Sequence, residues 1–264
     1  MSNSVHSNRI IFLLLIVILL FPGCAKDNDN PVTPEDSDNY MWVHFKGDST
    51  KVMFESLPKS TADGEEAIQL SSFIDTSLIH PYYDKNSNSY DSRSLYCYQI
   101  AGDDGFSASQ KGYPNNIWGE LQLGHVLISG RRVIFPDDKI DLAGAYNVKS
   151  ARHIYIYRKF DLAFTDSTLC IELRKITPVQ VTNPDNNLEE AISLKDAVAY
   201  MVAVPDNFQY NILSLDNFGP SEEMSWTQFQ TGYWLLSSEK TMFADTSLSG
   251  GKYKVKVLEK ILLK

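Results

Sequence analysis

Two of the three cysteines and the five histidines are the residues of this sequence best suited to metal, redox or acid–base chemistry. Cys97 and Cys170 each stand in a stretch of alternating apolar residues, where a cysteine is more often a small buried side chain than a ligand. In an oxidising compartment the two thiols are also able to form a disulfide, and the sequence leaves this open. The histidines lie at positions 6, 44, 80, 125 and 153. No two of them have the spacing of zinc ligands, so we predict no zinc site.

The hydroxyl and carboxyl side chains also lack a catalytic pattern. Ser107 and Ser109 stand outside any Gly-x-Ser-x-Gly motif, so the sequence gives no support for a nucleophilic serine. Several aspartates offer oxygen ligands for Ca²⁺, but their spacing is not that of an EF-hand loop, and Asp-Gly is an ordinary turn. These aspartates are Asp103, Asp104, Asp137, Asp138 and Asp141. We therefore predict neither catalytic residues nor a metal site.

Six aromatic, basic or acidic residues are candidates for contacts with a ligand or partner. Four of them also have a structural interpretation: the tryptophan as a core anchor, the histidine as a packing residue, and the adjacent arginines as a solvated hairpin tip. The candidates are Asp104, Phe106, Trp118, His125, Arg131 and Arg132.

Composition identifies a folded domain with an acidic surface. The 264 residues are 43% hydrophobic and 22% charged, which excludes wholesale disorder. The formal net charge is −9. It argues against a general nucleic-acid-binding protein, because such proteins displace counterions with a basic surface.

The N-terminal segment has the pattern of an export signal. Arg9 precedes an apolar run over 10–21, whose helical length of about 18 Å is too short for a hydrocarbon core of about 30 Å. The run leads to Gly23-Cys24 and resembles the signal of bacterial lipoproteins, in which the cysteine is lipidated and becomes the new N-terminus. Phe21 departs from that pattern, which usually has Leu three residues before the cysteine. The alternative is an ordinary secretory signal over 1–23 with an incidental Cys24.

The residues after Cys24 support an anchored protein. The stretch 24–39 is polar, acidic and contains prolines, which predicts a flexible tether. Ala25 resembles the residue after the cysteine in lipoproteins sorted to the outer membrane, and Lys26-Asp27 resembles the signal of surface-exposed ones. We therefore expect a bacterial cell-envelope protein, anchored by lipid to the outer membrane and facing the periplasm or the cell surface.

Residues 40–264 contain the same sequence blocks twice in the same order. This self-similarity predicts a duplication, with repeat units at 40–160 and 161–264. In one block Tyr98, followed six residues later by Asp104, is matched to Tyr200 and Asp206. The other matched blocks are 65–70 with 189–194, 118–129 with 226–237, 132–137 with 240–245, and 145–156 with 252–263.

Hydrophobic periodicity predicts an α+β fold, with two duplicated β-rich units that contain short helices and pack together. The acidic starts of 65–70 and 189–194 predict short helices, and a third is predicted at 118–124. Alternating residues predict strands, two of them joined in a hairpin across 129–131. The predicted strands span 51–57, 96–101, 125–129, 132–135, 146–157, 169–176, 199–204 and 253–263.

The order Asp104-Gly105-Phe106-Ser107, then Pro136, then Lys149 resembles the C-terminal half of the sulfite-oxidase-type molybdopterin-binding domain. In that family a strand ends in Asp-Gly-Tyr/Phe-Ser, a Pro ends a later strand, and a Lys precedes the last strand. The resemblance implies molybdopterin with a cysteine thiolate on molybdenum, a position that only Cys97 suggests here. The basic residues and histidine that hold the pterin phosphate find no clear match, and the second-half counterpart of Cys97 is taken as Ala199. A cofactor-free descendant is therefore expected.

These observations leave two functions. The favoured one is a non-catalytic envelope lipoprotein, held at the membrane by its lipid, that binds an envelope protein or a small ligand and needs no cofactor. The alternative is a molybdopterin-dependent oxidoreductase of the sulfite-oxidase type, in which Cys97 would be the metal ligand. Neither function involves nucleic acid.

Overall fold

The computed structural model describes residues 39–107, 117–136 and 146–264. It shows that the predicted α+β fold class is wrong. Strands make up 42% of the structure and helices 22%, so the fold is β-rich. The α-helices in the described ranges are short: α1 (Ile117–Leu123), α2 (Leu194–Met201) and α3 (Trp226–Phe229). No described helix is long and apolar enough to cross a membrane. The predicted signal peptide, Cys24 and the tether up to residue 38 lie outside the described residues.

Four strands form the central sheet of the first half. β2 pairs antiparallel with β1, β1 pairs parallel with β10, and β10 pairs antiparallel with β7. Alternate residues of β1 and β10 are buried, as expected of strands with one face on a core. The strands are β1 (Tyr40–Phe45), β2 (Asp48–Met53), β7 (Tyr96–Gly102) and β10 (Ala151–Ala163).

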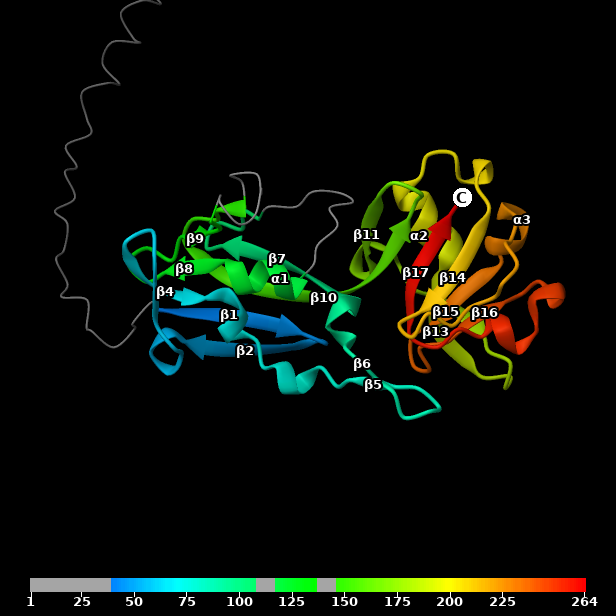
Figure 1. Ribbon diagram of the computed structural model, residues 1–264, viewed down its shortest axis with the longest axis horizontal. Coiled ribbons are helices and arrows are strands. Elements are labelled where there is room, and N and C mark those ends of the chain that lie inside the picture. Colours follow the sequence, from blue (N-terminus) through cyan, green and yellow to red (C-terminus); the bar gives the residue numbers. More distant parts are fainter. Residues whose placement is uncertain (1–38, 108–116, 137–145) are drawn as a thin grey trace, which may run out of the picture. The chain divides into compact units, whose positions relative to one another are not determined.

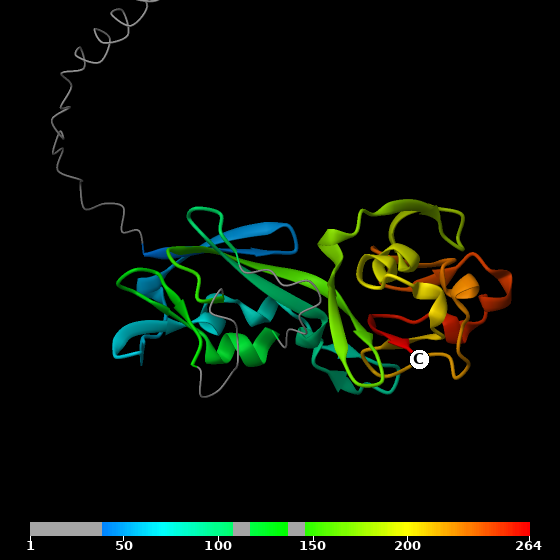
Figure 2. The same cartoon turned by 90° about the horizontal axis from the view of Figure 1, so that it is seen from above.

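The second half builds the same order of strands on the continuation of β10. The antiparallel β11 (Thr168–Glu172) and the parallel β17 (Leu258–Leu263) both pair with it, and β14 (Tyr210–Ser214) pairs antiparallel with β17. Along β10, residues 151–158 pair with β7 and residues 159–163 pair with β11. The strand can be followed through both halves in Figure 1 and Figure 2. The predicted boundary at 160/161 therefore falls inside a strand.

Each half also contains a four-stranded sheet in which all neighbours are antiparallel. The order is β3-β4-β8-β9 in the first half and β12-β13-β15-β16 in the second. The same order twice is what a duplicated unit would give, and the duplication itself stays a prediction. The strands are β3 (Ser60–Ala62), β4 (Glu65–Gln69), β8 (His125–Leu127), β9 (Val133–Ile134), β12 (Val179–Thr182), β13 (Leu188–Ser193), β15 (Gly232–Leu235) and β16 (Thr241–Phe243), with a separate hairpin of β5 (Tyr82–Tyr83) and β6 (Ser89–Tyr90).

Each half has its own hydrophobic core. The first core includes the fully buried Phe54, Ile68 and Leu121, and the second includes Phe160 and Tyr210. Burying side chains of this size contributes about 1.5–3 kcal/mol each, so both cores stabilise the fold substantially.

The segments 65–70 and 189–194 are strands β4 and β13, not the predicted helices. Asp63 and Gly64 have φ angles of 53° and 76° and close a two-residue turn between β3 and β4. Asp-Gly favours this turn because both positions need positive φ. Asn186, with φ of 60°, lies in the corresponding turn before β13. The hairpins, rather than the acidic residues, therefore decide the structure here and make the fold β-rich.

The predicted strand at 199–204 is wrong as well, because its first residues belong to α2. Ser193 begins this helix, and its hydroxyl accepts a hydrogen bond from the N–H of Asp196 at 3.2 Å. The counterpart of β7 is β14, which starts at Tyr210. The counterpart of Cys97 is therefore Gln209 and not Ala199.

Matching β7 to β14 pairs Tyr98 and Asp104 with Tyr210 and Asp216, which have the same spacing of six residues. Asp104 accepts a hydrogen bond from the N–H of Phe106 at 2.9 Å, and Asp216 accepts one from the N–H of Phe218 at 3.3 Å. Both phenylalanines are 50% exposed. The earlier match at Asp206 satisfied the spacing by coincidence.

Other local predictions are confirmed, some with shorter bounds. The strand at 96–101 is β7, the helix at 118–124 is α1, and the predicted hairpin pairs β8 with β9. The predicted strands at 51–57 and 169–176 end in short 3₁₀ turns, Phe54–Ser56 and Leu173–Lys175. The final strands β10 and β17 start later than predicted, because Ser150 and Val257 before them have positive φ.

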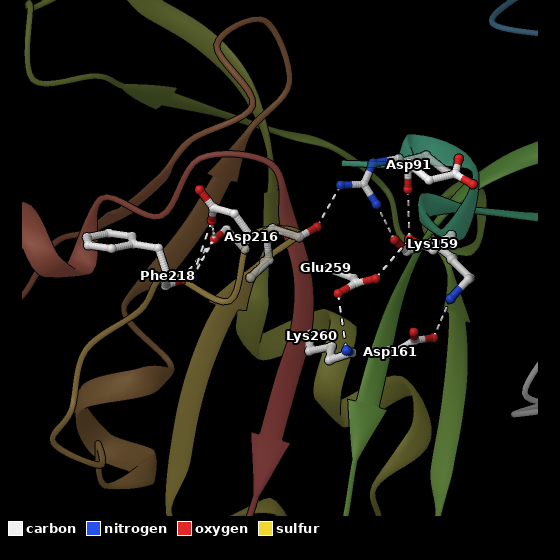
Figure 3. Close-up of polar contacts among 11 residues, drawn as sticks. Asp91, Lys159, Asp161, Asp216, Phe218, Glu259 and Lys260 are labelled. Atoms are coloured by element: carbon white, nitrogen blue, oxygen red, sulfur yellow. Dashed lines mark hydrogen bonds and ion pairs between the residues drawn. The ribbon is translucent and has the colours of Figure 1, made fainter. Parts of the chain in front are cut away.

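Buried polar groups connect the two halves where β10 passes from one sheet to the other (Figure 3). Lys159 pairs with Asp161 at 2.5 Å, and their side chains are only 6% and 15% exposed. Ser94 of the first half donates a hydrogen bond to Glu259 of the second at 2.9 Å. Burial raises the pKa of Asp161. We interpret this cluster as structural, since its charged groups bond to one another.

Candidate functional site

The outward face of the first central sheet carries a row of aromatic and imidazole rings. Ile154 and Ile156 of β10 enter the core, so His153, Tyr155 and Tyr157 lie on the opposite face. The parallel register of β1 and β10 places His44 beside Tyr155. We call the set of His44, His153, Tyr155 and Tyr157 the ring row.

The rings of the row stack on one another. His44 and Tyr155 have centroids 4.3 Å apart with planes 13° apart, and Tyr155 and Tyr157 have centroids 5.9 Å apart with planes 6° apart. Stacked rings cover each other's faces and present their polar edges. The ring row therefore offers hydrogen-bonding groups rather than a flat apolar surface.

Arg174, in the 3₁₀ turn after β11, closes one end of the ring row. Its guanidinium carbon lies 3.6 Å from the ring centroid of Tyr157. The same group donates hydrogen bonds to the Tyr157 hydroxyl and to Glu172, both at 2.7 Å, and to the side-chain oxygen of Gln99. A planar guanidinium held by three partners is a fixed positive charge.

Two hydroxyl groups in this network keep their own hydrogen for another acceptor. The Tyr157 oxygen accepts from Arg174, and the Ser107 oxygen accepts from the Gln99 amide at 2.8 Å. Within the described part of the chain, neither hydroxyl has an acceptor for its hydrogen. Burial raises the pKa of Tyr157 to about 12, so its hydroxyl stays protonated at neutral pH. Both groups are therefore available as donors.

A cavity of about 410 Å³ lies over these donors. Its size is within the range of small-molecule sites. The functional side chains that line it are Gln99, Asp103, Ser107, His153, Tyr155, Tyr157 and Arg174. A second cavity of about 360 Å³ lies on the other side of Tyr157 and Arg174 and is lined in part by His44 and Ser49.

The charged side chains at the cavity of about 410 Å³ are held in ion pairs. Asp103 receives hydrogen bonds from Arg152 at 2.7 Å and from Arg131 at 2.5 Å, and these hold the pKa of Asp103 below its ordinary value. Arg174 is paired with Glu172. Of the two charged side chains that line the cavity, Arg174 is the positive one and lies beside the Tyr157 hydroxyl. The hydroxyl donors and this guanidinium together suit an anion.

The structure separates most of the predicted contact residues. Asp104 caps its own turn, and Phe106 next to it is exposed. Trp118 is buried in the first core, as its structural interpretation predicts. Arg131 lies at the site only through its ion pair with Asp103.

His125 and Arg132 are brought together, in a third cavity of about 430 Å³. It is also lined by Asn147 and the aromatic ring of Phe135. This cavity is on the small antiparallel sheet and not on the ring row. Among the calcium candidates, Asp137, Asp138 and Asp141 lie outside the described residues, as does Ser109.

Sequence reasoning missed the main site residues Gln99, Tyr155, Tyr157 and Arg174. The stretch His153-Ile-Tyr-Ile-Tyr157 did carry a signal, because rings alternate with core isoleucines. No sequence signal pointed to Arg174, because it reaches the site from the 3₁₀ turn after β11, outside the strands that carry the ring row.

The second half does not repeat this site. Tyr155 pairs with His44, whereas its counterpart Leu262 pairs with Ala163. The other neighbour of Leu262 is the buried Asn211. The same position of the sheet is therefore polar and aromatic in the first half and largely apolar in the second.

Cys97 does not fit the role of a molybdenum ligand. Its side chain is completely buried, and its thiol lies 3.7 Å from the carbonyl oxygen of Tyr157. A hydrogen bond with the Cys170 thiol, together with burial, raises the pKa of Cys97, whereas a metal ligand must be a thiolate. Both cysteines are free thiols. The described residues contain no group of three or more His, Cys, Asp or Glu able to hold a metal ion.

Comparison with known proteins adds no relative: no family model, no curated protein and no solved structure matches this chain.

Proposed function

We propose that this protein is a lipid-anchored envelope protein whose folded part binds a small anionic ligand, such as a carboxylate or an oxyanion, over the ring row. One observation carries the proposal: the hydroxyl hydrogens of Tyr157 and Ser107 and the guanidinium of Arg174 converge on one cavity of about 410 Å³. Hydrogen bonds from neutral and cationic donors to an anion are among the stronger polar interactions.

The difference between the halves supports a function in binding. Folding alone does not require polar side chains in a hydrogen-bonded network on the outward face of a sheet. At the corresponding position the second half has the apolar residues Leu262 and Ala163. The first half instead places Arg174, Gln99 and Tyr157 in a connected network. Such a network is costly to desolvate, so its presence favours a role in recognition.

The envelope location rests on the sequence. The short apolar run before Cys24 and the polar stretch after it favour export and lipid attachment. A lipid anchor with a tether would hold the binding site at the membrane surface, where it would meet diffusible anions.

The test is binding of sulfate, inorganic phosphate and galacturonate to the full chain in detergent, measured by isothermal titration calorimetry. We expect at least one of these probes to bind, and Tyr157→Phe to weaken it about tenfold, the effect of one lost donor. Arg174→Gln should abolish binding, because it removes the charge and two organising hydrogen bonds.

The matched control is Tyr83→Phe, since Tyr83 is 58% exposed in β5 and lies outside the site. It should bind as the wild type does. Equal affinity of the Tyr157→Phe, Arg174→Gln and control variants would contradict the proposed site, and no binding of any probe would contradict the proposed ligand class.

A further inference from the structure

We propose that His44 and His153 form a proton-binding site coupled to the neighbouring cavity, so that an anion and a proton are bound together. This inference rests on the proposed function and adds a second binding partner to the same site, the proton.

The two imidazoles are joined by a direct hydrogen bond. The Nε2 atom of His44 and the Nδ1 atom of His153 are 2.9 Å apart, and the Nδ1 atom of His44 is 2.7 Å from the hydroxyl of Ser49. One nitrogen of the central pair must donate and the other accept. A proton added to an outer nitrogen keeps this bond, whereas protonation of both central nitrogens would place two N–H groups against each other. The pair therefore accommodates one extra proton.

Of the two histidines, His153 is the one that lines the cavity proposed for the anion. His153 lines the cavity of about 410 Å³ together with Tyr155, Tyr157 and Arg174. Among the described residues its Nε2 atom has no hydrogen-bond partner. When His153 Nδ1 donates the central bond, the added proton goes to this Nε2 atom and gives the cavity both a donor and a positive charge. When His44 Nε2 donates, His153 Nε2 already carries its hydrogen, and the added proton brings the positive charge to the pair.

The surroundings of the pair disfavour its protonation. Burial lowers the pKa of both histidines, and the neighbouring His153 lowers the pKa of His44 further. Arg152 of β10 also lowers the pKa of His153, while Asp103 after β7 raises it. From β2 the pair faces Ser49, and along β10 it faces the ring of Tyr155. The oppositely charged Lys46 and Asp48 line the second cavity together with His44.

An anion in the cavity would reverse this balance. Its negative charge favours the protonated pair, and by thermodynamic linkage the proton favours the anion by the same factor. We expect the affinity for the anion to increase about tenfold between pH ~7.5 and pH ~5. Titration of Asp103 should not contribute to the change in affinity over this pH range, because Arg131 and Arg152 hold the pKa of Asp103 below its ordinary value.

The test is calorimetric titration of the full chain with sulfate, whose charge is constant over this pH range. Repeating the titration near pH 6 in two buffers of different ionisation enthalpy gives the number of protons taken up per sulfate bound. We expect a fractional uptake, rising toward one proton, and a tenfold pH dependence of affinity. The double variant His44→Gln/His153→Gln should abolish the uptake while sulfate still binds, because glutamine keeps a hydrogen-bonding side chain but does not titrate. Each single variant leaves one titratable imidazole and should retain part of the uptake.

The control variant is His80→Gln, which changes an exposed histidine outside the site and should leave proton uptake unchanged. Sulfate binding with no proton uptake and constant affinity would overturn the coupling and leave the proposed function standing. If sulfate, phosphate and galacturonate all fail to bind at both pH values, the proposed function fails and the coupling falls with it.

Discussion

The guanidinium of Arg158 donates a hydrogen bond to the backbone carbonyl oxygen of Leu258 at a distance of 2.6 Å. Arg158 closes the first half of β10, and Leu258 opens the last strand of the second half. The same guanidinium donates to the carbonyls of Leu95 at 3.2 Å and Lys159 at 2.5 Å. Burial lowers the pKa of Arg158 to about 10, which still leaves it charged at neutral pH. One side chain thus satisfies carbonyl groups from both halves.

Replacing this arginine should weaken the whole fold. Arg158→Gln would leave buried carbonyls without donors, and we expect the free energy of unfolding to fall by about 2–4 kcal/mol. Urea denaturation followed by tryptophan fluorescence measures this change. Arg132→Gln is the matched control, because Arg132 is exposed, and it should change stability by less than about 0.5 kcal/mol. Equal losses in the two variants would contradict the role of Arg158 at the junction.

Acid should destabilise the protein partly through Asp103. The arginines lower the folded-state pKa of Asp103 below its unfolded value, so its contribution to stability is present above the unfolded pKa. That contribution is lost as the pH falls through the folded-state pKa. Asp103→Asn should therefore lower the melting temperature near neutral pH and converge with the wild type at strongly acidic pH. If the melting temperatures of Asp103→Asn and the wild type are equal at all pH values, the ion pairs of Asp103 with Arg131 and Arg152 contribute nothing to stability.

The two buried thiols should be unreactive until the protein unfolds. In a chain carrying Cys24→Ala, Cys97 and Cys170 are the remaining cysteines, and they are 0% and 6% exposed. We expect a thiol reagent to modify the native protein about 100-fold more slowly than the unfolded one, because modification needs local opening. Unfolding without reductant should release two reactive thiols. Finding none would mean that the pair forms the disulfide which the sequence left open.

Lipid attachment is tested at one residue. Cys24→Ala should abolish incorporation of labelled fatty acid and move the protein from the detergent phase to the aqueous phase on phase separation. The folded part should keep its melting temperature, since residues 39–264 form a compact unit of their own. Unchanged labelling of the Cys24→Ala variant would instead indicate a different anchor or an uncleaved signal.

The sequence was most informative where local physics decides the structure. The helix at Trp118 and the hairpin after His125 follow from local patterns and are confirmed. The helices predicted from the acidic pairs were wrong, because a turn at Asp63-Gly64 pairs those residues with a neighbouring strand.

The candidate site was harder to predict, because it depends on pairing between distant segments. His44 and His153 are more than a hundred positions apart, and only the parallel register of β1 and β10 brings them into contact. Arg174 reaches Gln99 for a similar reason, across the junction of the two halves. A single sequence contains no local signal of such contacts.

The strand β10 makes the two halves of the described structure inseparable. It closes the first central sheet and opens the second, so the joined sheet has seven strands, and the second half contributes three of its own and shares the fourth. Either half expressed alone would lack an inner strand or carry an unpaired extension of one. The two halves should therefore fold and unfold as one cooperative unit.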